Sequence, residues 1–140
     1  MGLFGKLFGL KTEEENKIEK MHNTMQYFRA ASFGILVKDE MIKKNDNFVK
    51  IGIYFFGALD CLAQENNISE NKTYEILCDF LMISFDMSSA EATSFANNLI
   101  DKVSQPKYSE YMNIGGETMF KWLGGDTYAP MILVNILKVV

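Results

Sequence analysis

The chain contains 140 residues, 48% of them hydrophobic, and carries a formal net charge of −4 at pH 7. This length suits one domain, and this apolar content excludes an intrinsically disordered chain. A chain of this size buries about two thirds of its surface on folding, so its core needs no metal or disulfide. No apolar run reaches the ~18 residues that span a bilayer, which argues against a transmembrane helix.

The charge is distributed unevenly along the chain. Residues 1–50 contain nine Lys or Arg and seven Asp or Glu, whereas residues 51–140 contain five and eleven. An acidic body argues against nucleic-acid binding, which depends on Lys and Arg that neutralise phosphates. It suits a basic protein partner, although the simpler interpretation is that the charge keeps the protein soluble.

The two cysteines, Cys61 and Cys78, lie within apolar stretches. Their number and spacing are not those of a disulfide framework, and we see no secretory signal. We therefore expect both thiols to be small core residues in a reducing, cytoplasmic compartment. The abundance of Asn, Lys and Ile hints at a bacterial source with an AT-rich genome.

Residues 1–11 are the strongest feature outside the predicted core. Five large apolar residues fall on one side of a helix and two lysines lie off that side: Leu3, Phe4, Leu7, Phe8, Leu10, Lys6 and Lys11. Such a segment is typical of an anchor that lies on a membrane or docks in a partner's groove. The equally weighted alternative is that it folds back onto its own bundle, because each buried side chain contributes about 1.5–3 kcal/mol. We assign partner or membrane contact to Leu3, Phe4, Lys6, Leu7 and Phe8.

A first long helix is predicted over residues 13–37. Thr12 and Glu15 have the spacing of a capping box, in which each side chain bonds the other residue's backbone amide. The apolar face recurs at steps of three and four residues: Ile18, Met21, Met25, Phe28, Ser32 and Ile35. The polar stretch 39–47 then breaks the pattern, and Asp46 or Asn47 is expected to cap the next helix.

The next two predicted helices are strongly apolar. The first covers residues 48–65, and its main face is formed by Phe48, Ile51, Phe55, Leu59 and Leu62. Gly52 and Gly57 would let a neighbouring helix approach it closely. The second starts after Asn67 or Ser69 and extends to Phe85. Because it is apolar nearly all round, we expect it at the centre of the bundle.

Three further helices complete the pattern. Ser88 and Glu91 have the spacing of a second capping box, and Gln105–Pro106 separates that helix from the next. Gly115–Gly116 indicates either a kink or a close crossing, and Gly124–Gly125 ends the helix. Asp126–Thr127 is expected to cap a last helix. We therefore predict an all-α fold in which residues 12–140 form a single compact bundle of about six helices, preceded by the amphipathic N-terminal segment.

Few residues suggest chemistry. His22 is the only histidine, and two remote thiols do not complete a zinc-ligand pattern with it. Asp60 and Asp79 lie within otherwise apolar helices, where a buried carboxylate is either paired or functional. Their candidate partners are Lys50 and Lys72, and the alternative is that both acids face water. No phosphate loop, calcium loop or hydrolase motif occurs, and we expect no metal or cofactor.

Three functions are compatible with these features. The first is a non-catalytic protein-binding module, such as an inhibitor or immunity-type protein, that binds a basic partner through its acidic body. The second is a peripheral membrane adaptor at the inner face of the membrane, anchored by residues 1–11. The third is an enzyme whose site is assembled from Asp60, Asp79, Glu75, His22 or the tyrosines. It is the least favoured, because these groups would have to converge without a local motif.

Overall fold

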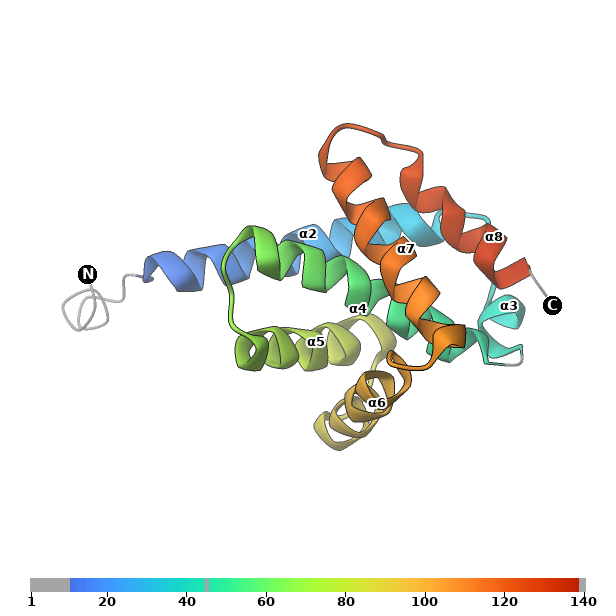
Figure 1. Cartoon of the computed structure of the whole chain (residues 1–140), viewed down its shortest axis with the longest axis horizontal. Coiled ribbons are helices and arrows are strands. Elements are labelled where there is room, and N and C mark those ends of the chain that lie inside the picture. The colour runs from blue at the N-terminus through green and yellow to red at the C-terminus, as the bar shows by residue number, and fades with distance from the viewer. Residues whose placement is uncertain (1–10, 45, 139–140) are drawn as a thin grey trace.

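The computed structural model describes residues 11–44 and 46–138. These ranges contain seven α-helices, one 3-10 helix and no strand, which confirms the predicted all-α fold (Figure 1). The elements are α2 (Glu13–Phe33), α3 (Asp39–Lys43), α4 (Asn47–Glu65), α5 (Glu70–Phe85), α6 (Ser89–Lys102), α7 (Pro106–Leu123), the 3-10 helix η1 (Ala129–Met131) and α8 (Ile132–Lys138). The prediction of about six helices missed α3, a short helix within the polar stretch that we expected to be a break.

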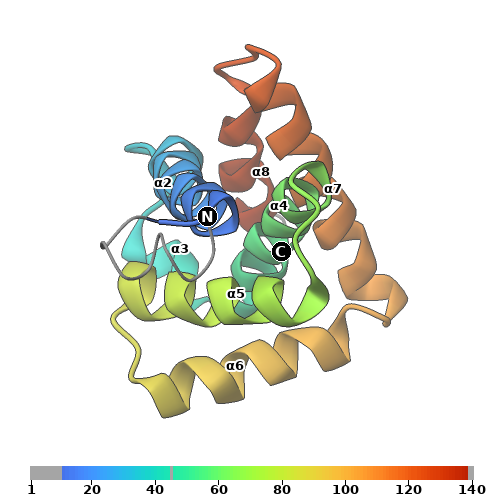
Figure 2. The ribbon, with the colours of Figure 1, turned by 90° about the vertical axis from the view of Figure 1, so that its left-hand side faces the viewer.

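Helix α4 is the centre of the bundle. It contacts every other described α-helix, and the buried residues of its first half lie on all sides of it. The prediction that α5 is central is wrong. Helix α5 packs on α2 and α4 through Leu77 and Phe80, and α6 runs beside it as an outer layer (Figure 2). Ile83, on the side of α5 that its neighbours leave uncovered, is 66% exposed.

Helices α4 and α7 cross at backbone contact, through glycines. A Cβ added to Gly57 would lie 2.0 Å from the carbonyl oxygen of Met112, and one added to Gly115 would lie 1.9 Å from that of Tyr54. No side chain fits between the two helices at these points. Of the two expectations for Gly115–Gly116, the close crossing is therefore the observed one, and α4–α7 is the most extensive helix pair among the described elements.

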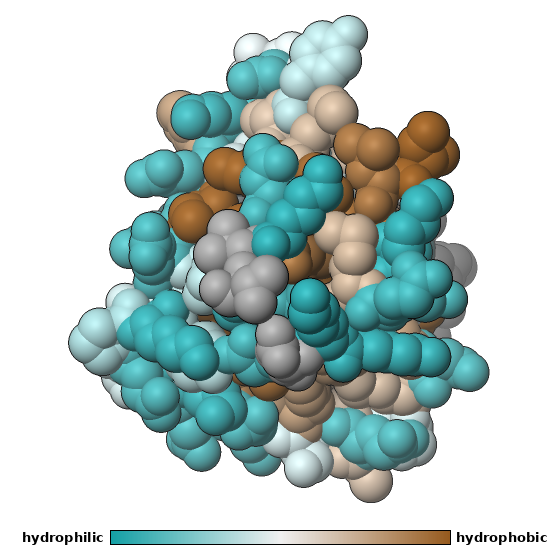
Figure 3. Space-filling model, turned by 90° about the vertical axis from the view of Figure 1, so that its right-hand side faces the viewer, coloured by the Kyte–Doolittle hydropathy of each residue, from teal (hydrophilic) through white to brown (hydrophobic). Residues whose placement is uncertain are grey.

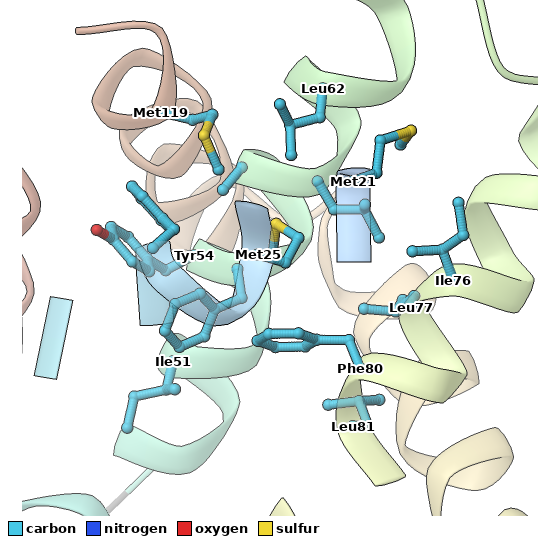
Figure 4. Close-up of a cluster of buried hydrophobic side chains, with 14 of the residues drawn as sticks. Met21, Met25, Ile51, Tyr54, Leu62, Ile76, Leu77, Phe80, Leu81 and Met119 are labelled. Atoms are coloured by element: carbon cyan, nitrogen blue, oxygen red, sulfur yellow. The ribbon is translucent and has the colours of Figure 1, made fainter. Parts of the chain in front are cut away.

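The core fills the space between α2, α4, α5 and α7. Met21 and Met25 of α2, Leu77 and Phe80 of α5 and Met119 of α7 surround the inner face of α4 (Figure 4). The apolar faces predicted for α2 and α4 account for most of these contacts.

One polar pair is enclosed in this core. The hydroxyl groups of Ser32 and Tyr54 are 2.9 Å apart, so each satisfies the other in the interior. Burial raises the pKa of the Tyr54 phenol, which keeps it protonated. Ser32 can therefore occupy the buried position predicted for it, because its hydroxyl group is hydrogen-bonded.

Helix α2 ends four residues earlier than predicted. Gly34 has φ 51° and ψ −145°, a conformation that L side chains rarely adopt, and its amide donates to the carbonyl of Ala30. The chain leaves the helical path there, and Ile35 is 83% exposed. The assignment of Ile35 to the core face is therefore wrong.

Several predicted caps are present. Of the capping box predicted at Thr12, the described hydrogen bonds contain only one half, in which the Thr12 hydroxyl accepts from the Glu15 amide. The Ser88–Glu91 capping box is complete. Ser69, rather than Asn67, caps α5. These bonds satisfy helix-terminal amides that have no partner within the helix.

Two helix starts differ from the predictions. The Asp46 side chain makes no capping bond at the start of α4. The buried Asn47 side chain instead donates to the carbonyls of Met41 and Leu137, at 2.6 and 3.2 Å, which ties α3 and α8 to α4. Near the C-terminus, Asp126 accepts from the Tyr128 amide in a turn, and η1 precedes α8.

Candidate functional site

The predicted site residues do not come together in the described part of the chain. Leu3, Phe4, Lys6, Leu7 and Phe8 lie outside the described residues. Asp60 is half-buried on α4, whereas the side chain of Asp79 on α5 is 57% exposed and faces His22 of α2, with 3.8 Å between Oδ2 and Nε2. Asp79 is thus not a buried acid.

The expected lysine partners pair with other acids. The ammonium groups of Lys50 and Lys72 lie 3.6 Å from Asp46 and 3.5 Å from Glu75. Asp60 instead accepts a hydrogen bond of 2.8 Å from the Gln64 amide, one turn further along α4. None of the described ion pairs includes Asp60.

Asp60 lies where two hollows adjoin, and together we call them the acidic groove. The first hollow has a volume of about 380 Å³ and lies between α4, α5 and α6, lined by Phe56, Asp60, Ala63, Gln64, Ile68, Glu70, Thr73, Tyr74, Leu77 and Ile100. The second, of about 330 Å³, lies between α4 and α7, lined by Gly57, Asp60, Cys61, Gln64, Glu65, Met112, Asn113, Gly116 and Glu117. Asp60 and Gln64 belong to both, so one surface continues across α4.

The groove combines carboxylates with an apolar lining. Four of its lining residues are acidic: Asp60, Glu65, Glu70 and Glu117. None of the described residues that line it is a lysine or arginine. The first hollow is mainly apolar, and Ile100 is 41% exposed at its edge. This arrangement attracts cations and offers apolar surface to cover.

Cys61 is affected both by its burial and by the acidic residues of the groove. Burial, and then the charges of Glu65 and Asp60, raise the pKa of its thiol above the usual range. The pKa of the Cys78 thiol, on α5, is likewise raised, chiefly by burial. Both thiols are therefore protonated at neutral pH, which makes them poor nucleophiles.

The second hollow exists because the helices that form it carry glycines there. Gly57 and Gly116 line it, and a Cβ on Gly116 would lie 3.4 Å from the carbonyl oxygen of Gly57. The close crossing at Gly57 and Gly115 thus brings the carboxylates of α4 and α7 to the two sides of a shallow channel.

A separate charged cluster joins the first turns of α4 and α7. Asp46 lies 2.9 Å from the Lys107 ammonium and accepts a 2.9 Å hydrogen bond from the Tyr108 hydroxyl. The bond from Lys107 is the main cause that lowers the pKa of Asp46 to about 2, and burial opposes it. The buried Lys50 lies 5.4 Å from the ring centre of Tyr111. With its acid and bases paired, this cluster is a cross-link between helices.

A third feature is an apolar surface that the sequence pattern did not predict. Ile35, Leu36, Tyr128 and Met131 are exposed around a hollow of about 320 Å³ between the end of α2 and η1; we call it the α2–η1 surface. On the face that carries α3 and α8, brown hydrophobic residues likewise reach the surface between teal hydrophilic ones (Figure 3). The α2–η1 surface lacks the charges that give the acidic groove a preference for one kind of partner.

Arg29, the only arginine in the chain, packs on aromatic rings. Its guanidinium lies 5.0 Å from the ring centre of Phe33 and 5.8 Å from that of Phe85, and burial lowers its pKa. Its Nε is buried without a hydrogen-bond partner among the described residues. No hollow described above includes it, so it is assigned a packing role.

Metal-binding clusters and membrane-spanning helices are both absent from the described ranges. No group of three or more His, Cys, Asp or Glu is arranged to hold a metal ion, and no described helix is both long and apolar enough to cross a membrane. Comparisons of the chain with protein-family models, curated proteins and solved structures found no match. The chemistry of the acidic groove is therefore the basis for a functional proposal.

Proposed function

We propose that this protein is a non-catalytic binding module whose acidic groove receives a basic, amphipathic segment of a partner protein, in the manner of an inhibitor or immunity-type protein. One observation carries the proposal: four carboxylates surround an apolar lining that contains no described lysine or arginine. The rest of the acidic body adds to the same negative field.

The two components of the groove favour different parts of the partner. Phe56, Ile68 and Ile100 offer apolar surface that leucine-like side chains of a partner would cover. Glu65 and Glu117 stand on either side of the α4–α7 channel and would meet lysine or arginine. A helix with one apolar face and basic flanks satisfies both requirements, and this is a common mode of peptide recognition. Exposed charges of this kind mainly accelerate association and weaken with salt.

The same groups are poorly suited to catalysis. Cys61 has a raised pKa, and Asp60 is held by Gln64 without a second titratable group described beside it in a general acid–base geometry. The enzyme hypothesis therefore gains no support from the groove, whereas binding requires only the surface and charge that the groove already presents.

The proposal is tested by affinity capture from a native lysate with the full chain and two charge variants. The groove variant is Asp60→Asn with Glu117→Gln. The matched control is Glu40→Gln with Glu110→Gln, which also removes two exposed acids but outside the groove. We expect a basic partner that wild type and control retain equally. The groove variant should bind it about fivefold to tenfold more weakly, because each exposed charge contributes up to ~1 kcal/mol.

The salt dependence of binding and hydrogen-exchange mapping of the complex test whether the groove is the interface. Raising the salt concentration should release the partner from the wild type, and hydrogen exchange on the complex should slow in residues 56–77 and 112–117. A partner that binds the groove variant as tightly as the control, or one that protects only the α2–η1 surface, would refute the proposal.

A further inference from the structure

We propose that residues 1–10 of the chain itself occupy the acidic groove when no partner is bound, so that partner binding displaces them. This inference rests on the proposed function, because it assigns an internal competitor to the same groove. Three properties of the chain support it: the chemistry of the segment, the place where the described chain begins and the length of chain available.

The segment has the chemistry that the groove selects. Residues 1–10 contain five large apolar residues on one helical side, one lysine and no acid. Lys6 lies off the apolar side, as does Lys11, where the described chain begins. An apolar face placed on Phe56, Ile68 and Ile100 would leave Lys6 near the groove's carboxylates. The segment thus resembles the basic, amphipathic partner proposed above.

The described chain begins beside the groove. Glu13 and Glu14, in the first turn of α2, share a hollow with Asn67 and Ile68 of the turn between α4 and α5. Ile68 also lines the acidic groove. Figures 1 and 2 show the start of α2 and the α4–α5 turn at the same end of the molecule. The segment is therefore tethered at one end of the surface that it would cover.

The available length selects the groove over the α2–η1 surface. Ten residues span about 15 Å as a helix, and the part of α4 that lines the groove, Phe56 to Gln64, is of similar length, about 13 Å. The α2–η1 surface lies at the opposite end of α2, whose 21 residues span about 31 Å. A helical segment attached at Lys11 would reach the groove of its own molecule but not that distant surface.

Because the segment is tethered to the domain, a weak contact is sufficient for it to occupy the groove. A short tether gives an effective concentration of about 1 mM, so a segment with a Kd of about 0.1 mM fills the groove in roughly nine molecules of ten. A partner would then bind about tenfold more weakly than it binds an empty groove.

The experiment compares three full chains. In the test variant, Leu7→Ser with Phe8→Ser removes part of the apolar face without changing charge. In the matched control, Leu7→Met with Phe8→Leu keeps that face. Amide NMR spectra should differ between the wild type and the test variant at groove residues such as Gln64, Thr73, Ile100 and Asn113, and should agree between the wild type and the control. A synthetic helical peptide of leucines and lysines, titrated into each chain, should bind the test variant about tenfold more tightly.

Each of the following outcomes would overturn either the inference or the proposed function. Unchanged groove amides overturn the inference, as do changes confined to Tyr128 and Met131, which would place the segment on the α2–η1 surface. Differences that grow with protein concentration overturn it in favour of a second copy as the binding site. Equal peptide affinity for all three chains overturns the inference while the proposed function stands. No peptide binding to any of them, including the emptied groove of the test variant, overturns the proposed function itself.

Discussion

Replacing Gly115 with alanine tests whether the backbone contact between α4 and α7 holds the bundle together. The added methyl group would lie 1.9 Å from the carbonyl oxygen of Tyr54 and 2.8 Å from its carbonyl carbon. The obstacle is backbone in the middle of the central helix, so no side chain can rotate away. Relief requires the two helices to separate by about 1.5 Å, since non-bonded heavy atoms prefer about 3.5 Å.

The expected change in the free energy of unfolding is the difference between two opposing contributions. Overpacking a well-packed contact costs typically 1–3 kcal/mol, and the upper end applies because the clash involves rigid backbone. Alanine in place of a helical glycine returns up to about 1 kcal/mol of helix propensity. We therefore expect Gly115→Ala to lower the free energy of unfolding by about 2 kcal/mol, and the melting temperature by roughly 8 °C in a domain of this size.

The neighbouring residue supplies the matched control. A Cβ on Gly116 would meet the carbonyl oxygen of Gly57 at 3.4 Å, an ordinary contact. Gly116→Ala should thus leave stability unchanged or raise it by up to ~1 kcal/mol. Urea unfolding followed by far-ultraviolet circular dichroism measures both variants. Equal stability of Gly115→Ala and Gly116→Ala would refute the reasoning, because the two differ only in what their methyl groups meet.

Three further predictions concern individual contacts. The pKa of Asp46 is lowered to about 2 from an ordinary value of 3.8, so the stability that it contributes is complete above pH 4 and disappears as the pH falls through 2. Asp46→Asn should remove about 1 kcal/mol at neutral pH and flatten stability between pH 4 and 2, whereas an unchanged acid profile in urea unfolding would contradict the role given to its bond with Lys107. Gly34→Ala should destabilise the fold by about 1–2 kcal/mol through its backbone conformation alone, since no atom lies within 4 Å of the added group; a thermal melt equal to that of wild type would show that α2 can end otherwise. Ser88→Ala should cost about 1 kcal/mol and speed hydrogen exchange in the first turn of α6, while exchange at the Glu91 amide that stays at the wild-type rate would mean that the capping box does not hold that turn.

The elements that local rules govern were predictable from the sequence. The N-cap at Thr12, the capping box at Ser88 and the proline at position 106 act within a single turn, so the spacing of a few residues defines them. The core faces of α2 and α4 follow from helical periodicity in the same way, until Gly34 breaks the helix and leaves Ile35 in solvent. The glycine alone did not reveal that break, because glycine is also compatible with a continuing helix.

The arrangement of the helices, and therefore the groove, could not be predicted from the sequence, because it depends on contacts between residues that are far apart in the chain. Apolar composition suggested α5 as the central helix, but the crossing at Gly57 and Gly115 puts α4 there. Of the groove's acids only Asp60 was singled out, because it interrupts an apolar pattern. Glu65, Glu70 and Glu117 look like ordinary solvated charges in sequence, and only packing gathers them around one hollow.

The glycine crossing also constrains the order in which the fold can form. Tyr54 and Gly115 are about 60 residues apart, so their contact closes a long loop and forms late relative to local helix pairs such as α5 and α6. Until α7 arrives, the apolar side of α4 that it covers has no partner. During synthesis that side remains uncovered until α7 has left the ribosome, and this interval is when the chain is most prone to aggregate or to need a chaperone.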